Sequence, residues 1–405
     1  MTAGESDDFI EYFPYTWYIR LINTIGRWLY NWFGITLFRV SRDALMKSAM
    51  KETKLNDFGD TFWQEPLNMF INILNDPVAS AFTRIAYRMR LQHSLVHRLQ
   101  LVDLFKRNKD LQTFPVKRPL FVMGLPRTGT SLLFALLAQD PAARPTYAWE
   151  QNEPFPPPEK ETFFTDKRIA QVQKRWNFIT KNVVGERFKA IHNMDPTKPE
   201  EDMELLLKVF VDPIVMFVRP DAKEFYDWFQ KCNARPFYEE ERRYLQVLGW
   251  KNPPQDHWVM KSPLNTIFSG TLMDVFPDGN FVWTHRKVSE VVPSACSLMR
   301  TLAALYRPWV DKREVGKATI DALKLGLERG ISERDARPDA NSRNIDVYYD
   351  TLMKDPIAAV KDIYKKFGYT YTQEFEDRMK QWLVENPQKK FGGHKYSLEE
   401  YGLDT

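Results

Sequence analysis

Cysteine is scarce in this sequence, and its charges almost balance. The 405 residues include two cysteines, Cys232 and Cys296. Two cysteines cannot build a disulfide framework and are typical of a reducing compartment. Lys and Arg exceed Asp and Glu by only 57 to 53, whereas nucleic-acid-binding proteins usually have a concentrated basic face. We therefore expect no nucleic-acid partner.

The sequence also has little that indicates a metal site. It contains no Cys-x-x-Cys pair, and its six histidines are scattered. His93 and His97 would lie one turn apart on a helix, but no third ligand is evident from the sequence. We therefore interpret both as ordinary helix residues and expect no metal ion.

Long hydrophobic runs are absent as well. No apolar stretch approaches the ~20 residues of a membrane-spanning helix, and the acidic N-terminus lacks the basic region of a signal peptide. These absences lead us to expect a cytoplasmic protein. Residues 17–40 are nevertheless rich in Trp, Tyr and Phe, interrupted by arginines. We favour an amphipathic helix packed on the domain; the alternative is peripheral membrane contact through residues 9–40.

What the sequence does contain is an alternation of short apolar runs with longer helical segments. This pattern favours an α/β fold with a mainly parallel central sheet flanked by helices. We expect a helical N-terminal region at 1–115, within the same globular unit as residues 116–405. The polar run 332–343 is interpreted as a loop and the Pro-rich run 153–158 as an extended surface loop. The expected strands are 120–123, 258–260, 281–284 and 345–349.

A glycine-rich loop follows the first expected strand. The loop contains Gly124 and Gly129 and leads into a helical run at 131–139. A strand, a glycine loop and a helix N-terminus can form an anion site, because backbone N–H groups point inward and the helix dipole favours negative charge. The alternative is a turn that merely joins a strand to a helix. The two glycines have the spacing of a nucleotide P-loop, but Thr130 stands where a P-loop has Lys.

The side chains of this loop suit one compact anion. Arg127 places a cation inside the loop, and hydroxyl groups follow it at Thr128, Thr130 and Ser131. Hydroxyls and an arginine can hold a phosphate or sulfate group without a metal ion. The loop therefore indicates a phosphate or sulfate site better than a site for a metal-bound triphosphate.

Two further cations follow expected strands. Lys261 comes directly after the run 258–260, and Arg286 comes after 281–284, with Ser294 eight residues further on. In an open parallel sheet, ligands bind beyond the carboxyl ends of the strands. We therefore expect Lys261 and Arg286 to converge with the glycine loop at one edge of the sheet.

These motifs together resemble the sulfotransferases that use 3′-phosphoadenosine 5′-phosphosulfate (PAPS). The loop 124–131 is similar to their 5′-phosphosulfate loop, and Arg286 with Ser294 resembles their 3′-phosphate motif. The resemblance covers about residues 116–405, the expected sulfotransferase domain. Weaker similarities to elements of this family lie at 258–263, 275–278, 348–356, 385–387, 393–396 and 398–403.

The resemblance implies a P-loop-like domain that binds PAPS as cosubstrate and releases 3′-phosphoadenosine 5′-phosphate, with no metal. It implies that Arg286 and Ser294 hold the 3′-phosphate. Arg suits this role because its planar fork grips phosphate oxygens in pairs. The 5′-phosphosulfate would be held by Arg127, Thr128, Gly129, Thr130 and Ser131, and Gly393, His394 and Lys395 would close over the nucleotide.

The same resemblance implies the catalytic groups. Arg127, where many cytosolic sulfotransferases have Lys, would stabilise charge on the leaving phosphate oxygen, because Arg does not donate a proton at ordinary pH. Lys261 would supply a proton or a second positive charge. Two residues are candidates for the general base: Glu150, placed as in tyrosylprotein sulfotransferases, and His192, nearer the position of the base in the cytosolic enzymes. The acidic run 199–202 is interpreted as helix capping, with acceptor recognition second.

The acceptor and two competing functions are left open by the sequence. The aromatic residues near the N-terminus favour a hydrophobic small-molecule acceptor with a hydroxyl or amine over a polysaccharide. One alternative function is a P-loop kinase of a small molecule, which the missing Lys after Gly129 disfavours. The other is a non-catalytic protein that binds an adenine nucleotide.

Overall fold

A parallel sheet lies at the centre of the molecule. The computed structural model describes residues 15–185, 188, 194–212, 215, 219, 222–306, 311–387 and 398–403. These residues form one five-stranded sheet of order β2-β3-β1-β4-β5, in which all neighbours are parallel. The predicted α/β class is confirmed. The strands are β1 (Leu120–Gly124), β2 (Ala143–Pro145), β3 (His257–Lys261), β4 (Asn280–His285) and β5 (Asn344–Tyr348).

β1 is the central strand, and all five of its residues are buried. A parallel strand covered on both faces has a continuous apolar sequence, which is why the run before the glycine loop predicted it correctly. In the register, Val122 pairs with Lys261 of β3, and Gly124 pairs with Thr284 of β4. The carboxyl ends of three neighbouring strands therefore meet at one edge of the sheet.

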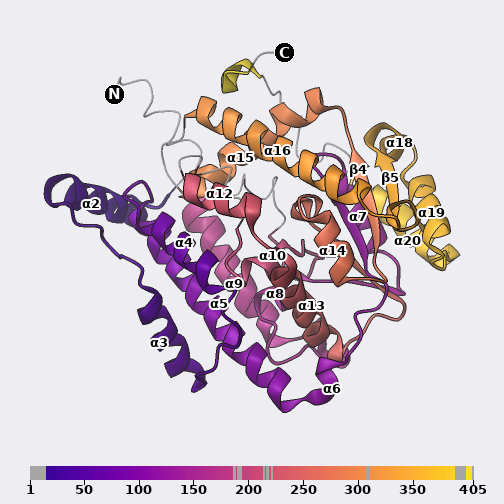
Figure 1. The fold of residues 1–405 in the computed structure, drawn as a ribbon, viewed down its shortest axis with the longest axis horizontal. Helices are drawn as coiled ribbons and strands as arrows, with labels where there is room; N and C mark the ends of the chain where they lie inside the picture. The colour runs from indigo at the N-terminus through magenta and orange to yellow at the C-terminus, as the bar shows by residue number, and fades with distance from the viewer. Residues whose placement is uncertain are drawn as a thin grey trace.

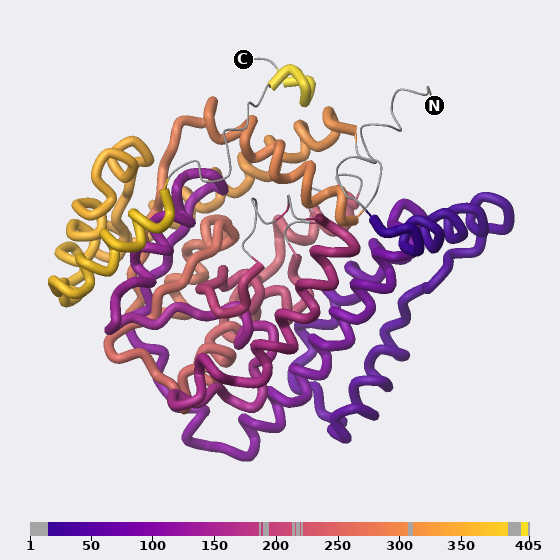
Figure 2. Tube along the Cα trace, turned by 180° about the vertical axis from the view of Figure 1, so that it is seen from behind, coloured from indigo at the N-terminus to yellow at the C-terminus, as the bar shows by residue number. Residues whose placement is uncertain are grey.

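Helices surround this sheet on both faces (Figure 1). Of the helices that precede β1, α2 to α5 lie on one side of the molecule, and α18 to α20 lie on the other, as both views show (Figure 2). Those before β1 are α2 (Trp17–Phe33), α3 (Arg42–Thr53), α4 (Gln64–Asn75), α5 (Ala81–Arg107) and α6 (Lys109–Gln112). Those after it are α7 (Thr130–Leu137), α8 (Ala148–Asn152), α9 (Lys167–Ile179), α10 (Met203–Leu207), α12 (Lys223–Lys231), α13 (Arg235–Trp250), α14 (Ser269–Val275), α15 (Val288–Tyr306), α16 (Lys312–Asp335), α17 (Ala340–Arg343), α18 (Tyr349–Lys354), α19 (Pro356–Phe367) and α20 (Gln373–Glu385).

The two faces of β1 belong to different parts of the core. Phe121 and Met123 pack in a large cluster that includes Leu45 of α3 and Leu95 of α5. The alternate residues of the strand pack in a second cluster with α7, α19 and α20. Side chains of a strand alternate between faces, so one strand joins both clusters. The N-terminal helices thus share a core with the sheet, and the division at residue 115 stays a prediction.

Two local expectations were wrong, and one short strand was missed. The polar run 332–343 is mostly helical, because α16 continues to Asp335 and α17 begins at Ala340; Glu333 there accepts a hydrogen bond from the backbone N–H of Gly270 at 2.9 Å. The run 153–158 is not a surface loop, since three of its four prolines are buried. Arg168 donates to two backbone carbonyls of that run, which satisfies them away from water. The three-residue strand β2 was not predicted.

α2 is the expected amphipathic helix, and it packs through a narrow face. Ile19 is fully buried, and a Cβ added at Gly26 would lie 2.8 Å from the Cβ of Ala81, so α2 approaches the start of α5 closely there. The opposite face exposes Trp17 and Trp32, which are 74% and 73% accessible. Among the described residues, no helix is both long and apolar enough to cross a membrane.

Candidate active site at the carboxyl edge of the sheet

The glycine loop turns sharply because two of its residues have backbones that favour glycine. Gly124 has a φ of 142° and Gly129 a φ of 95°. A Cβ at Gly124 would lie 2.5 Å from Oγ1 of Thr284, so no side chain fits between β1 and β4. Thr128 and Thr284 share a hydrogen bond of 2.6 Å between their hydroxyls, which braces the loop on the neighbouring strand. The Thr128 hydroxyl therefore points into the protein.

The loop leads directly into α7. The first N–H groups of a helix have no partner within the helix and point toward its N-terminus, where they favour an anion. Thr130 is buried, whereas Ser131 is exposed. Of the three predicted hydroxyls, Ser131 is thus the one that reaches the surface of the site.

The structure brings the two predicted arginines and Ser294 together. The Nε of Arg127 donates to Oγ of Ser294 at 3.0 Å, and Arg286 donates to the backbone carbonyl of Arg127 at 3.1 Å. Arg286 also lies over the ring of Tyr349 at 4.0 Å and donates to Glu290 at 2.9 Å. These contacts hold both guanidinium groups beside the loop, as expected from the shared carboxyl edge of the parallel strands.

Lys261, the last residue of β3, is the third cation of the site. Its Nζ lies 3.4 Å from Oγ of Ser131 and forms an ion pair with Glu201. Lys261 is almost fully buried, while Glu201 is partly exposed. A carboxylate, an ammonium and a hydroxyl therefore meet beside the loop. From the sequence we interpreted Glu201 as part of a helix cap, because no neighbouring residue indicated that its side chain faces β3.

That capping interpretation is confirmed only in part, since Asp202 is the N-cap residue of α10 but its side chain, within the described residues, makes no cap to the helix N–H groups. It instead accepts a hydrogen bond from Asn265 at 3.0 Å, and its backbone N–H donates to the carbonyl of Lys261 at 3.2 Å. Burial raises the pKa of Asp202 to about 7. These contacts hold the acidic run against the end of β3.

Glu150 occupies a different environment from Glu201. It is fully buried, and Arg144 donates to one of its oxygens at 2.6 Å. The backbone N–H of Tyr147 donates to the other oxygen at 3.0 Å, at the start of α8. Burial raises the pKa of Glu150, and the Arg144 guanidinium opposes this shift. Both oxygens are engaged inside the protein.

Four of the predicted site residues, His192, Gly393, His394 and Lys395, lie outside the described residues. The geometry of the site therefore comes from the loop, Lys261, Arg286, Ser294 and Glu201.

Comparison with known proteins identifies the class. Residues 119–373 match the sulfotransferase family, and the chain belongs to that family. It is an enzyme of sulfuryl transfer, and the family implies PAPS as the donor. The site fits an anionic donor, because the N-terminus of α7, the exposed Ser131 and three cations lie together at one edge of the sheet.

Three similar proteins come from mycobacteria. The crystal structure of sulfotransferase STF9 from Mycobacterium avium has a TM-score of 0.81 and 30% identity, covering 90% of this chain and 93% of that one. Sulfotransferase STF1 from Mycobacterium tuberculosis has a TM-score of 0.75 and 28% identity, covering 90% and 96%. The omega-hydroxy-beta-dihydromenaquinone-9 sulfotransferase Stf3 of Mycobacterium bovis is 23% identical over 298 residues, 70% of this chain and 71% of Stf3.

Proposed function

We propose that the enzyme binds PAPS along the carboxyl edge of the sheet and transfers its sulfuryl group to the hydroxyl of a hydrophobic small molecule. The observation that supports this most directly is the meeting of Lys261 with Ser131 and Glu201 beside the glycine loop. A cation, an anion-binding loop and a carboxylate are the groups that in-line transfer to a hydroxyl requires.

The loop and the arginines bind different parts of the donor. The N-terminus of α7 and Ser131 hold the 5′-phosphosulfate, and Arg286 with Ser294 holds the 3′-phosphate. Arg127 contacts Ser294 through its side chain and Arg286 through its carbonyl, so it connects the two subsites. Because the Thr128 hydroxyl bonds Thr284, Thr128 contributes through its backbone N–H and by bracing the loop.

Glu201 is the general base in this proposal. Its carboxylate takes the proton from the acceptor hydroxyl while the acceptor oxygen bonds to sulfur and the bond from sulfur to the phosphate oxygen breaks. Lys261 and Arg127 neutralise the negative charge that develops on that phosphate oxygen. Glu150 is buried and fully engaged with Arg144 and Tyr147, which supports a structural role for it.

The proposed class of acceptor is supported by the name of one relative and by the exposed face of α2. The name of Stf3 describes a hydroxylated menaquinone derivative, which is a lipophilic acceptor with a hydroxyl. An enzyme that takes such an acceptor gains from contact with a lipid surface. The exposed aromatic face of α2, with Trp17, Trp28 and Trp32, is of the kind that lies in a membrane interface. We therefore include peripheral membrane contact through this region in the proposal.

Calorimetric binding of 3′-phosphoadenosine 5′-phosphate and of ATP with Mg²⁺ tests the donor site. We expect the bisphosphate to bind more tightly than ATP. Arg286→Ala should weaken its binding by roughly 10- to 100-fold, the equivalent of one charge-assisted hydrogen bond. Arg378→Ala, in an exposed ion pair of α20, is the matched control and should leave binding unchanged.

The outcome also separates the alternative functions. A preference for ATP with Mg²⁺ would favour the kinase. Tight bisphosphate binding without sulfuryl transfer from PAPS to a panel of long-chain alcohols, prenols and phenols would contradict the acceptor proposal.

A further inference from the structure

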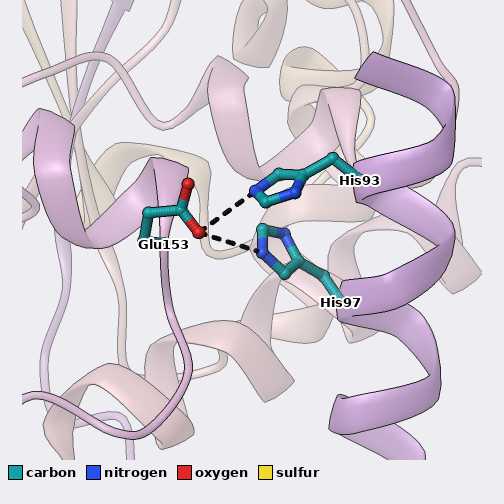
Figure 3. A group of neighbouring side chains, drawn as sticks. All are labelled: His93, His97 and Glu153. Atoms are coloured by element: carbon teal, nitrogen blue, oxygen red, sulfur yellow. Dashed lines mark ion pairs between the residues drawn. The ribbon is translucent and has the colours of Figure 1, made fainter. Parts of the chain in front are cut away.

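A second cluster of chemically active side chains lies away from the sulfuryl-transfer site. His93 and His97 of α5 point toward Glu153, which directly follows α8 (Figure 3). The Nε2 atoms of His93 and His97 lie 3.1 and 3.7 Å from the same carboxylate oxygen of Glu153. The three potential ligand atoms all lie within 4.8 Å of one another.

Helical spacing and tertiary packing each contribute part of this cluster. The two histidines are four residues apart, so they share a face of α5, and their ring centroids are 4.1 Å apart. Glu153 reaches them from the proline-rich run, whose Phe155 ring lies 5.8 Å from the ring of His97 in α5. The third ligand, which the sequence did not reveal, is therefore present in space.

The contacts of the two histidines with Glu153 are ion pairs of poor hydrogen-bond geometry. Among the described residues, the buried Nε2 of His93 has no partner with hydrogen-bond geometry, although the Glu153 oxygen is close. The Nε2 of His97 lies beyond hydrogen-bond distance from that oxygen. A buried polar atom left without a partner costs free energy. One ion placed between the three atoms would engage all of them.

The ligand types and spacing suit zinc. Two imidazoles and a carboxylate form a common three-ligand zinc set, with bonds of about 2.0–2.2 Å. Tetrahedral geometry at that bond length places ligand atoms roughly 3.3 Å apart. The separations of 3.1 and 3.7 Å lie on either side of this value. We propose that His93, His97 and Glu153 bind a divalent transition-metal ion, with zinc as the best match.

Two cations border the cluster and affect how tightly it would bind a metal ion. Arg175 donates to the other carboxylate oxygen of Glu153 at 2.7 Å, which is how outer groups orient a metal-bound carboxylate. The Nζ of Lys208 lies 3.1 Å from Nδ1 of His97. Its positive charge repels a metal ion, and while Lys208 donates to Nδ1 the Nε2 of His97 carries the ring proton, which must be released to solvent when that nitrogen binds a metal ion. Replacing Lys208 by Met should therefore retain or strengthen metal binding while leaving all three ligands in place.

The proposed ion would act as a structural cross-link. It would join α5 of the N-terminal region to the segment after α8, which belongs to the region matching the sulfotransferase family. Metal binding would then raise the stability of the folded chain by mass action. This inference does not depend on the proposed acceptor, donor geometry or base.

Metal analysis of the full chain, purified without a metal-affinity tag, tests the proposal. We expect about one zinc ion per chain by mass spectrometry, and cobalt should replace it with the visible absorption of a site with nitrogen ligands. Removing the ion with a chelator should lower Tm, and zinc but not Mg²⁺ should restore it. His93→Gln should abolish these effects; its partly exposed ring makes this variant better tolerated than one at buried His97.

Lys208→Met is the comparison that separates a metal site from an ion-pair cluster. A metal site predicts that this variant still binds cobalt and zinc. The proposal is overturned if the wild type holds less than about 0.1 zinc per chain and its Tm does not respond to added zinc. It is equally overturned if His93→Gln binds zinc as the wild type does.

Discussion

Glu150 and Glu201 show how the surroundings of a residue decide its chemistry. Glu150 lies close to the loop helix in sequence, yet Arg144 and the start of α8 occupy both its oxygens. Glu201 lies far from the loop in sequence, yet it contacts Lys261 beside Ser131 and is partly exposed. A general base must reach the acceptor proton, and Glu201 has the more accessible carboxylate.

Glu201→Gln should therefore lower kcat by about 10²- to 10⁴-fold, the usual contribution of a general base. Binding of 3′-phosphoadenosine 5′-phosphate should change little, because the loop and the arginines remain. Steady-state kinetics with PAPS and calorimetry measure the two effects separately.

Variants at neighbouring and competing positions control that experiment. Glu200→Gln should retain most activity. Glu150→Gln should lower the free energy of unfolding, because it weakens the buried ion pair with Arg144. It should change kcat little. A large loss of kcat in Glu150→Gln or His192→Gln, with Glu201→Gln close to wild type, would assign the base to that other residue.

At the scale of elements, α2 has two unlike faces. Ile19 and Gly26 pack against the body of the protein, while Trp17, Trp28 and Trp32 are exposed. The expectation that α2 packs on the domain is confirmed for one face, and membrane contact through the exposed face stays a prediction. Burying large apolar side chains in a lipid interface is favourable by about 1.5–3 kcal/mol for each fully buried side chain.

Replacing Trp17 and Trp32 by Ser should lower partitioning onto vesicles of phosphatidylcholine and phosphatidylglycerol by about tenfold or more. Vesicle sedimentation measures this effect. Sulfation of a vesicle-embedded acceptor should fall with it, while sulfation of a short, water-soluble acceptor should not. Val384→Ser removes an equally exposed apolar residue from α20 and serves as control. Equal partitioning of all variants would contradict membrane contact through α2.

At the scale of the whole molecule, a buried ion pair joins the N-terminal helices to the rest of the chain. Arg98 of α5 donates to Glu240 of α13 at 2.7 Å, and both side chains are almost fully buried. Arg98 also donates to the backbone carbonyls of Phe58 and Asp60 at 2.7 and 3.2 Å. Removing Arg98 leaves the buried Glu240 with only the partly exposed Arg243, which donates to it at 3.3 Å.

Arg98→Met should lower the free energy of unfolding by about 3–5 kcal/mol, measured by urea denaturation. Arg378→Met breaks the exposed pair with Glu374 in α20 and should cost no more than about 1 kcal/mol. The double variant Arg98→Met/Glu240→Gln should be more stable than Arg98→Met alone. Similar losses for Arg98→Met and Arg378→Met would show that the buried pair does not contribute as argued.

Local sequence patterns suffice to predict four of the five strands of the parallel sheet and most of its anion-binding edge. Apolar runs define buried strands, and parallel strands present their carboxyl ends at one edge, so the strand pattern by itself places Arg127, Lys261 and Arg286 together.

Tertiary packing, in contrast, determines which side chains from other segments face those strand ends and the neighbouring helices. Glu201 joins Lys261, Glu150 is buried, and Glu153 joins His93 and His97. The reason is physical. Periodicity reports the face of an element on which a residue lies, whereas contacts between distant segments depend on how those faces pack.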